Sequence, residues 1–132
     1  MNFKYLVIIS FLFIFLGSSA FRKNQDNNKT IVWNKVSHNF GTINQGELME
    51  AEFTFQNTGN DTLKIENVMG SCGCIATLWP KQSILPKDNG KITVRFDSNG
   101  KSGQHLKSIT VYTNLGAYYL EIKALIIKAE KK

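Results

Sequence analysis

The chain has 132 residues and a formal net charge of +6 at pH 7, with 42% hydrophobic and 20% charged residues. This length suits one domain, whose core needs neither a metal nor several disulfides. The lysines are scattered except for a basic tail at residues 129–132, so the charge lacks the basic stripe of a nucleic-acid-binding protein.

The N-terminus carries the three parts of a secretory signal peptide. Lys4 supplies a short positive region, residues 6–16 are almost entirely apolar, and Ser18 and Ala20 place small side chains at the −3 and −1 positions. Because the apolar run is shorter than the roughly 20 residues of a membrane span, cleavage of residues 1–20 is favoured over an uncleaved anchor. The sequence therefore predicts an exported protein, periplasmic or extracellular, that meets the membrane only through this segment before cleavage.

Residues 21–30 are polar and without periodicity, and we expect them to form a flexible leader. From residue 31 to residue 128, apolar and polar residues alternate, which is typical of strands with one buried and one exposed face. Turn residues separate the runs, and no window shows helical spacing. The predicted strands are residues 31–40, 49–56, 62–68, 75–78, 83–85, 91–97, 106–113 and 117–128.

Seven or eight short antiparallel strands predict an all-β protein built as a sandwich, with a small closed barrel as the alternative. Trp33 and Trp79 are expected to lie in the core between the sheets, because an aromatic residue in a strand is usually a core residue.

Several motifs follow one another in the order of a known bacterial family. FGTINQGE (40–47) leads into FTFQNTGNDTLKI (53–65), and VMGSCGC (68–74) precedes ILPKDNGKITVRFDSNGKSG (84–103) and KSITVYTN (107–114). In combination they resemble the family catalogued as domain of unknown function 1573, from about Trp33 to Ile126. The resemblance implies an immunoglobulin-like sandwich, related to abnormal-spindle and hydin modules, and an export habit without an established activity.

Four residues carry the family motif most clearly: Phe40, Gly41, Asn57 and Gly59. We expect Phe40 to close one end of the core and Gly41 to let the chain turn behind it, while Asn57 and Gly59 belong to a turn between strands. Lys87 departs from the pattern, because the family usually has glycine at this place, and a local change of the turn is expected.

Cys72 and Cys74 are the two cysteines of the chain, in a loop with Met69, Ser71 and Gly73. An oxidising compartment favours a disulfide. In an extended chain their Cα atoms would lie about 6.5 to 7 Å apart, at the outer limit for this bond, so a bend at Gly73 is required. Such a bond would be labile and only weakly stabilising.

Two other interpretations of this pair stay open. Cys72, Cys74 and Met69 supply the soft sulfur ligands that Cu(I) prefers, with His38 or His105 completing the site if the fold brings one near. The cysteines would otherwise be two free, packed thiols. Redox use requires an exposed sulfur and a lowered thiolate pKa, and the helix start that commonly lowers it is not predicted here.

No catalytic set is recognisable elsewhere. His38 and His105 are isolated, and Glu50 with Glu52 on one strand face indicates a solvated surface rather than a cation site or an acid pair. The sequence thus predicts no enzyme and no cofactor. It predicts an exported binding or envelope-structural module that engages a protein or glycan partner, with a thiol site at Cys72 and Cys74 as the alternative.

Overall fold

The computed structural model describes residues 31–128, so the predicted signal peptide, leader and basic tail lie outside the described residues. Strands, turns and bends make up this range, and it holds no helix that could cross a membrane. The strands are β1 (Ile31–Trp33), β2 (Ser37–Asn44), β3 (Leu48–Asn57), β4 (Ile65–Gly70), β5 (Ile75–Leu78), β6 (Asn89–Asp97), β7 (Gly103–Thr113) and β8 (Gly116–Ile127).

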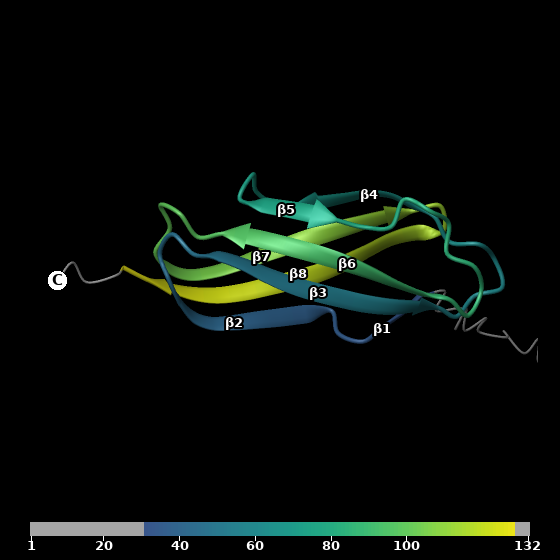
Figure 1. Cartoon of the computed structure of the whole chain (residues 1–132), viewed down its shortest axis with the longest axis horizontal. Coiled ribbons are helices and arrows are strands. Elements are labelled where there is room, and N and C mark those ends of the chain that lie inside the picture. Colours follow the sequence, from purple (N-terminus) through teal and green to yellow (C-terminus); the bar gives the residue numbers. More distant parts are fainter. Residues whose placement is uncertain (1–30, 129–132) are drawn as a thin grey trace, which may run out of the picture.

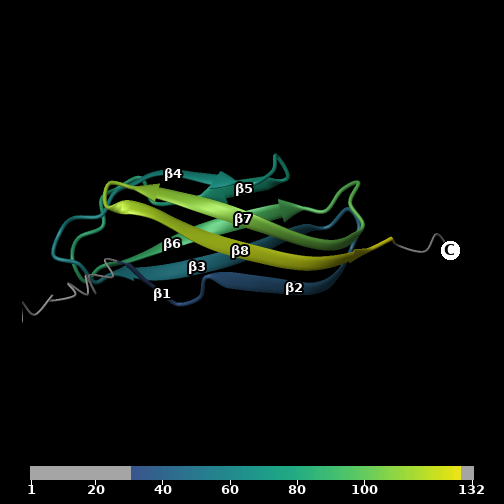
Figure 2. The same ribbon diagram turned by 180° about the vertical axis from the view of Figure 1, so that it is seen from behind.

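These strands form two four-stranded sheets that pack face to face (Figures 1 and 2). Sheet A has the order β1-β3-β6-β5 and sheet B the order β2-β8-β7-β4. Along the strands, the side chains that point toward the other sheet are buried, so the core lies between the two sheets. The most fully buried core side chains are Phe53, Leu63, Ile92, Val94, Phe96, Ile109, Val111, Leu120, Ile122 and Ile126. The predicted all-β sandwich of seven or eight strands is confirmed.

The strand predicted over residues 31–40 is two strands in different sheets. The Asn34 amide donates to the Thr54 carbonyl at 2.9 Å in sheet A, and the Val36 carbonyl accepts from the Glu121 amide at 2.8 Å in sheet B. The chain therefore changes sheets within three residues while it keeps its direction. As a result β2 pairs in parallel with β8, and the expectation of an entirely antiparallel sandwich is wrong for this pair.

The prediction of a strand over residues 83–85 is also wrong. Leu63 and Ile84 form an isolated bridge, with backbone hydrogen bonds of 2.9 and 2.8 Å in the two directions. Pro80 and Pro86 flank this segment, and proline lacks the amide that a longer ladder requires. The fourth predicted strand is β5, with the same bounds, 75–78.

Trp33 and Trp79 border the core rather than filling it. Both are partly buried and pack against the core cluster. The Trp33 ring lies 4.9 Å from the ring of Phe55, and the ammonium of Lys81 lies 3.3 Å from the centre of the Trp79 ring. They differ from the expectation because Trp33 ends β1 and Trp79 directly follows β5, and these two strands are the outer strands of sheet A.

Candidate functional site

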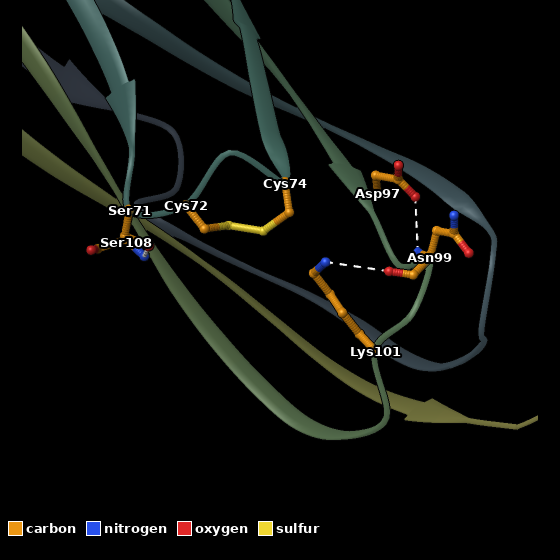
Figure 3. Close-up of a disulfide and its surroundings, with 7 residues drawn as sticks. All are labelled: Ser71, Cys72, Cys74, Asp97, Asn99, Lys101 and Ser108. Atoms are coloured by element: carbon orange, nitrogen blue, oxygen red, sulfur yellow. Dashed lines mark hydrogen bonds between the residues drawn. A yellow bond between two sulfur atoms is a disulfide. The ribbon is translucent and has the colours of Figure 1, made fainter.

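The cysteine pair lies on the connection from β4 of sheet B to β5 of sheet A. Cys72 and Cys74 form a disulfide, and their Cα atoms are 5.2 Å apart (Figure 3). A turn causes this short distance: the Ile75 amide donates to the Cys72 carbonyl at 3.2 Å, closing residues 72–75 around Gly73. The expected bend at Gly73 is present, and the disulfide interpretation agrees with the structure.

Backbone hydrogen bonds hold both sides of this turn. On the β7 side, the Ser71 amide donates to the Ser108 carbonyl at 2.9 Å, and the Ser108 amide donates to the Ser71 hydroxyl at 3.2 Å. On the β6 side, the Asp97 amide donates to the Cys74 carbonyl at 2.9 Å. The turn is thus anchored to both sheets by contacts that do not involve sulfur.

Close packing of β4 on β5 also fixes the turn. A Cβ atom on Gly70 would lie 2.5 Å from the Cβ of Ile75, so this approach requires glycine. The Thr77 hydroxyl donates to the Val68 carbonyl at 3.0 Å and joins the two strands farther along. Figures 1 and 2 both show β4 and β5 side by side along one long edge of the sandwich.

The loop between β6 and β7 faces the disulfide. Figure 3 shows the side chain of Lys101 extending from this loop toward the two sulfurs, with its ammonium donating to the Asn99 carbonyl at 3.4 Å. The Asp97 carboxylate lies on the same side and accepts from the Asn99 amide at 2.9 Å. Sequence reasoning missed Lys101 because its only signal is a lysine after a turn, 27 positions from Cys74 in the chain.

Binding of Cu(I) requires thiolates, so the disulfide would have to be reduced first. Met69 is exposed on β4, and the described residues contain no group of three or more His, Cys, Asp or Glu side chains that could hold a metal. His105 turns its Nε2 to the Ser102 carbonyl at 3.1 Å. The metal interpretation therefore gains no ligand from the fold.

His38 is in contact with Lys35 and Phe40. The Lys35 ammonium lies 2.9 Å from His38 Nδ1, and the two rings of His38 and Phe40 pack edge to face at 4.6 Å. Burial, and secondarily the charge of Lys35, lower the pKa of His38. The ring is therefore neutral at pH 7, and its surroundings are those of a packed side chain.

Phe40 lies at the edge of the core, and Gly41 lies inside β2 at a bulge rather than in a turn. Phe40 is partly buried and stacks on Phe96 at 6.5 Å between ring centres. Gly41 has a φ of +71°, and its amide donates to the Asn39 carboxamide oxygen at 2.9 Å. This left-handed residue produces the bulge at which β2 shifts register against β8.

Asn57 organises the turn after β3. Its side chain is fully buried, donates to the carbonyls of Asp61 (2.9 Å) and Ile84 (3.0 Å), and accepts from the Gly59 amide at 3.1 Å. Both motif residues of this turn, Asn57 and Gly59, thus have a structural role.

The outer face of sheet A is charged. Arg95 pairs with Glu50 at 2.7 Å and Lys91 pairs with Glu52 at 2.6 Å, all four side chains being about half exposed. Each carboxylate therefore has its own cation from β6, which excludes the cation-site interpretation and supports the solvated face.

The outer face of sheet B is apolar by comparison. Its large apolar side chains, 40% to 70% exposed, are here called the sheet B face: Met69, Leu106, Tyr112, Tyr119, Leu125 and Ile127. The strand registers place all six on the side opposite the core. The sequence carries one local sign of this face, three consecutive apolar residues at 125–127.

A groove of about 620 Å³ runs across this face at the bulge of β2. Leu106 and Leu125 supply its large apolar side chains. Polar groups come from Asn39, Thr42, Gln104 and His105, and Lys123, which pairs with Glu121 at 3.0 Å, adds a charge. The groove exists because the bulge at Gly41 interrupts the pairing of β2 with β8 between Asn39 and Thr42.

Comparison with known proteins now identifies the family. The sequence model of the family described as "Protein of unknown function (DUF1573)" matches residues 31–129. The chain belongs to this family. Comparison with curated protein sequences finds no significant match.

Solved structures with this DUF1573 fold share little sequence with the chain. A protein of unknown function from Porphyromonas gingivalis W83 has a TM-score of 0.63 at 15% identity, over 73% of this chain and 46% of that one. The PapD-like domain 7 of human CEP192 has a TM-score of 0.63 at 13% identity, over 76% and 87%. The secreted serine protease VesC from Vibrio cholerae has a TM-score of 0.60 at 12% identity, over 80% and 25%. These likenesses show an immunoglobulin-like, PapD-like fold, and the chain spans about half of the Porphyromonas protein.

Lys87, the departure from the DUF1573 pattern, has a φ of +73°, the one positive φ of a non-glycine residue in the described range. Its amide donates to the Asn57 carbonyl at 2.7 Å, and its carbonyl accepts from Gln56. These bonds hold a left-handed backbone that suits glycine, and the fold keeps the turn with lysine in place.

Proposed function

We propose that this DUF1573 chain is an exported, non-catalytic binding module that docks a protein partner on the sheet B face. The observation that carries the proposal is the contrast between the two outer faces. Sheet A presents two ion pairs and three exposed apolar side chains, Val32, Leu48 and Leu78. Sheet B presents one ion pair, Lys123 with Glu121, and six large apolar or aromatic side chains, of which Leu106 and Leu125 line a groove. Apolar patches of this kind mark interaction sites on soluble domains.

The groove favours a protein over a glycan partner. Sugars stack on flat aromatic rings, whereas Leu106 and Leu125, the large apolar side chains of the groove, are aliphatic. An aliphatic or aromatic side chain of a partner protein fits between them, and Met69, Tyr112 and Tyr119 extend the contact surface farther along the sheet. Tyrosine and methionine are enriched in protein interfaces.

Export is supported by the signal-peptide pattern of residues 1–20 and by the disulfide, a bond typical of oxidising compartments. An envelope-structural role is the same proposal with a permanent partner in place of a transient one. The two differ in the lifetime of the complex rather than in the surface used.

Site-specific crosslinking tests the docking face. A photoreactive amino acid replaces Leu106 in the groove or, as the matched control, Thr93 on the outer face of sheet A, and intact cells are irradiated. We expect one discrete crosslinked protein from position 106 and none from position 93. The complex should disappear when Leu125→Asp is added to the chain carrying the probe at 106.

The proposal is wrong if both positions give the same products, or if Leu125→Asp leaves the position 106 product unchanged. Folding of each variant is checked by its urea unfolding midpoint. The same irradiation followed by fractionation tests export, because a cytoplasmic product would contradict it.

A further inference from the structure

We propose that Cys72 and Cys74 form a reversible dithiol–disulfide site, in a turn held by the backbone and faced by the ammonium of Lys101. This is a redox activity beyond the proposed docking function, and it rests on different residues. The DUF1573 family description assigns no role to the pair.

The turn is held in place without its sulfur–sulfur bond. The hydrogen bonds described above tie Ser71 to Ser108 of β7 and Cys74 to Asp97 of β6, and the bond from the Ile75 amide to the Cys72 carbonyl closes the turn itself. The glycine contact at Gly70 fixes the approach of β4 to β5. After reduction, the two thiols consequently remain next to each other, ready to close again.

The bond also contributes little to the stability of the fold. It closes a loop of three residues, and the stabilisation from a disulfide falls as the loop shortens. A disulfide whose loss leaves the domain folded can be opened and closed repeatedly in the native state. A structural staple, by contrast, resists reduction by glutathione.

Access and charge favour exchange at this place. Both cysteines are partly exposed, and Cys74 packs against the core cluster, so Cys72 is the sulfur open to attack. Lys101 and Asp97 are the charged groups drawn around the disulfide (Figure 3). The Asp97 carboxylate already accepts the Asn99 amide, and the Lys101 ammonium favours a neighbouring thiolate.

The exchange takes two electrons from a thiol donor. A donor thiolate attacks Cys72 Sγ, the bond between Cys72 and Cys74 breaks, and Cys74 leaves as a thiolate. A second donor thiolate then attacks the donor sulfur of the mixed disulfide and releases the Cys72 thiolate. The donor ends as a disulfide, and the pair, after taking two protons from water, ends as two thiols.

Equilibration with glutathione tests this on the oxidised, purified chain. Native protein is incubated in buffers of different reduced-to-oxidised glutathione ratios, acid-quenched, alkylated and weighed. We expect reversible conversion to the dithiol, with the urea unfolding midpoint almost unchanged. If only urea-unfolded protein is reduced, or if reduction unfolds the domain, the pair is a structural staple and the proposal fails.

Single variants test the order of attack. Cys74→Ser leaves Cys72 alone and should form its mixed disulfide with oxidised glutathione roughly tenfold faster than Cys72→Ser does, because thiol exchange depends on access. Equal rates in the two variants would contradict the proposal that Cys72 is the sulfur attacked first. Neither variant touches the sheet B face, so crosslinking from position 106 should persist in both, whichever way the redox test falls.

The role of Lys101 is tested by the pH profile of alkylation of the reduced pair. Lys101→Gln should move the midpoint of iodoacetamide reactivity up by about half a pH unit, since an adjacent cation stabilises the thiolate. Lys101→Arg should restore it, and Lys64→Gln, a lysine of the β4 side, should leave it unchanged. An unchanged midpoint in Lys101→Gln would show that Lys101 does not act on the sulfurs.

Discussion

Asn57 shows how a single polar side chain can define a turn in this sandwich. Its amide group satisfies two backbone carbonyls and one backbone amide in a place that excludes water. The motif indicated that the residue belongs to a turn, but its partner Ile84 lies 27 positions away and no local pattern predicts it. The sequence thus predicts that Asn57 lies in a turn, but only the fold shows which groups its side chain binds.

Asn57→Ala should lower the free energy of unfolding by about 2 to 4 kcal/mol, because a fully buried side chain loses three hydrogen bonds. Urea unfolding followed by tryptophan fluorescence measures this. Asn60→Ala, three residues along on the exposed side of the same turn, is the matched control and should change little. Similar losses in both variants would contradict the role of the buried amide.

Lys87 is the residue at which the chain departs from its family. Lys87→Gly should raise the free energy of unfolding by about 0.5 to 1 kcal/mol, because glycine adopts a positive φ without the steric cost that a side chain carries. Lys87→Ala keeps a Cβ atom and should give no such gain. A gain in the alanine variant equal to that of glycine would show that the charge, not the backbone, is responsible.

His38 makes the stability depend on pH. Burial and Lys35 lower its pKa below the ordinary value of 6.5, so the unfolded chain takes up a proton before the folded one does. Stability contributed by the neutral ring is therefore present above pH 6.5 and is lost as the pH falls through 6.5 toward the lower folded pKa.

The measurement is the urea midpoint at about pH 7.5 and about pH 5.5, either side of the histidine titration. We expect a smaller drop in His38→Gln than in the unaltered chain. Equal drops in the two proteins would assign the pH dependence to other groups.

Among the elements, β3 and β6 show a close approach that the sequence does not reveal. Phe55 of β3 lies directly opposite Gly90 of β6, and a Cβ atom on Gly90 would collide with the phenyl ring. The strand predicted over residues 91–97 begins only after this glycine, whereas in the structure Gly90 is the second residue of β6. The position requires glycine because the ring of Phe55 occupies the space that a side chain would take.

Gly90→Ala should therefore destabilise the domain by about 1 to 3 kcal/mol, the usual range for overpacking. The cost should shrink when Phe55→Leu is introduced as well, since leucine lacks the ring atoms that the new Cβ would meet. A double-mutant cycle from urea unfolding gives the coupling between the two residues. Additive effects would show that the ring is not the obstacle.

The strands themselves were largely predictable, whereas their partners were not. Alternation placed β3, β5, β6, β7 and β8 to within a few residues, because one buried face leaves a period of two in the sequence. The division of residues 31–40 between two sheets was not predicted. The inward positions change from 31 and 33 in β1 to 38 and 40 in β2, but each segment is too short for this change to stand out in the sequence. The partner of a strand can be distant in the chain, and the local sequence does not specify which strand it is.

At the scale of the whole molecule, the outer and the inner face of sheet B differ in what they contribute to stability. Leu125→Asp on the sheet B face should change the free energy of unfolding by less than about 0.5 kcal/mol, as exposed positions do. Leu120→Ala, inward on the same strand, should cost about 2 to 5 kcal/mol. A large loss in Leu125→Asp would mean that this face stabilises the domain itself and would weaken the docking proposal.

The candidate site was predictable in part for the same reason. Two cysteines two positions apart suggested the disulfide and the bend it requires, both of which are local. Lys101 and the sheet B face depend on strands brought together from distant parts of the chain. A pattern within a short stretch of sequence therefore predicts neither the position of Lys101 nor the sheet B face.

The parallel pairing of β2 with β8 has a consequence for how the domain comes into being. Ser37 and Glu121, joined across these strands, are separated by 84 residues. Sheet B is therefore incomplete until β8 has been made, and contacts this distant slow folding because a long loop must close first. A chain that crosses a membrane unfolded, as the proposed export requires, thus has an interval in which its own topology delays folding.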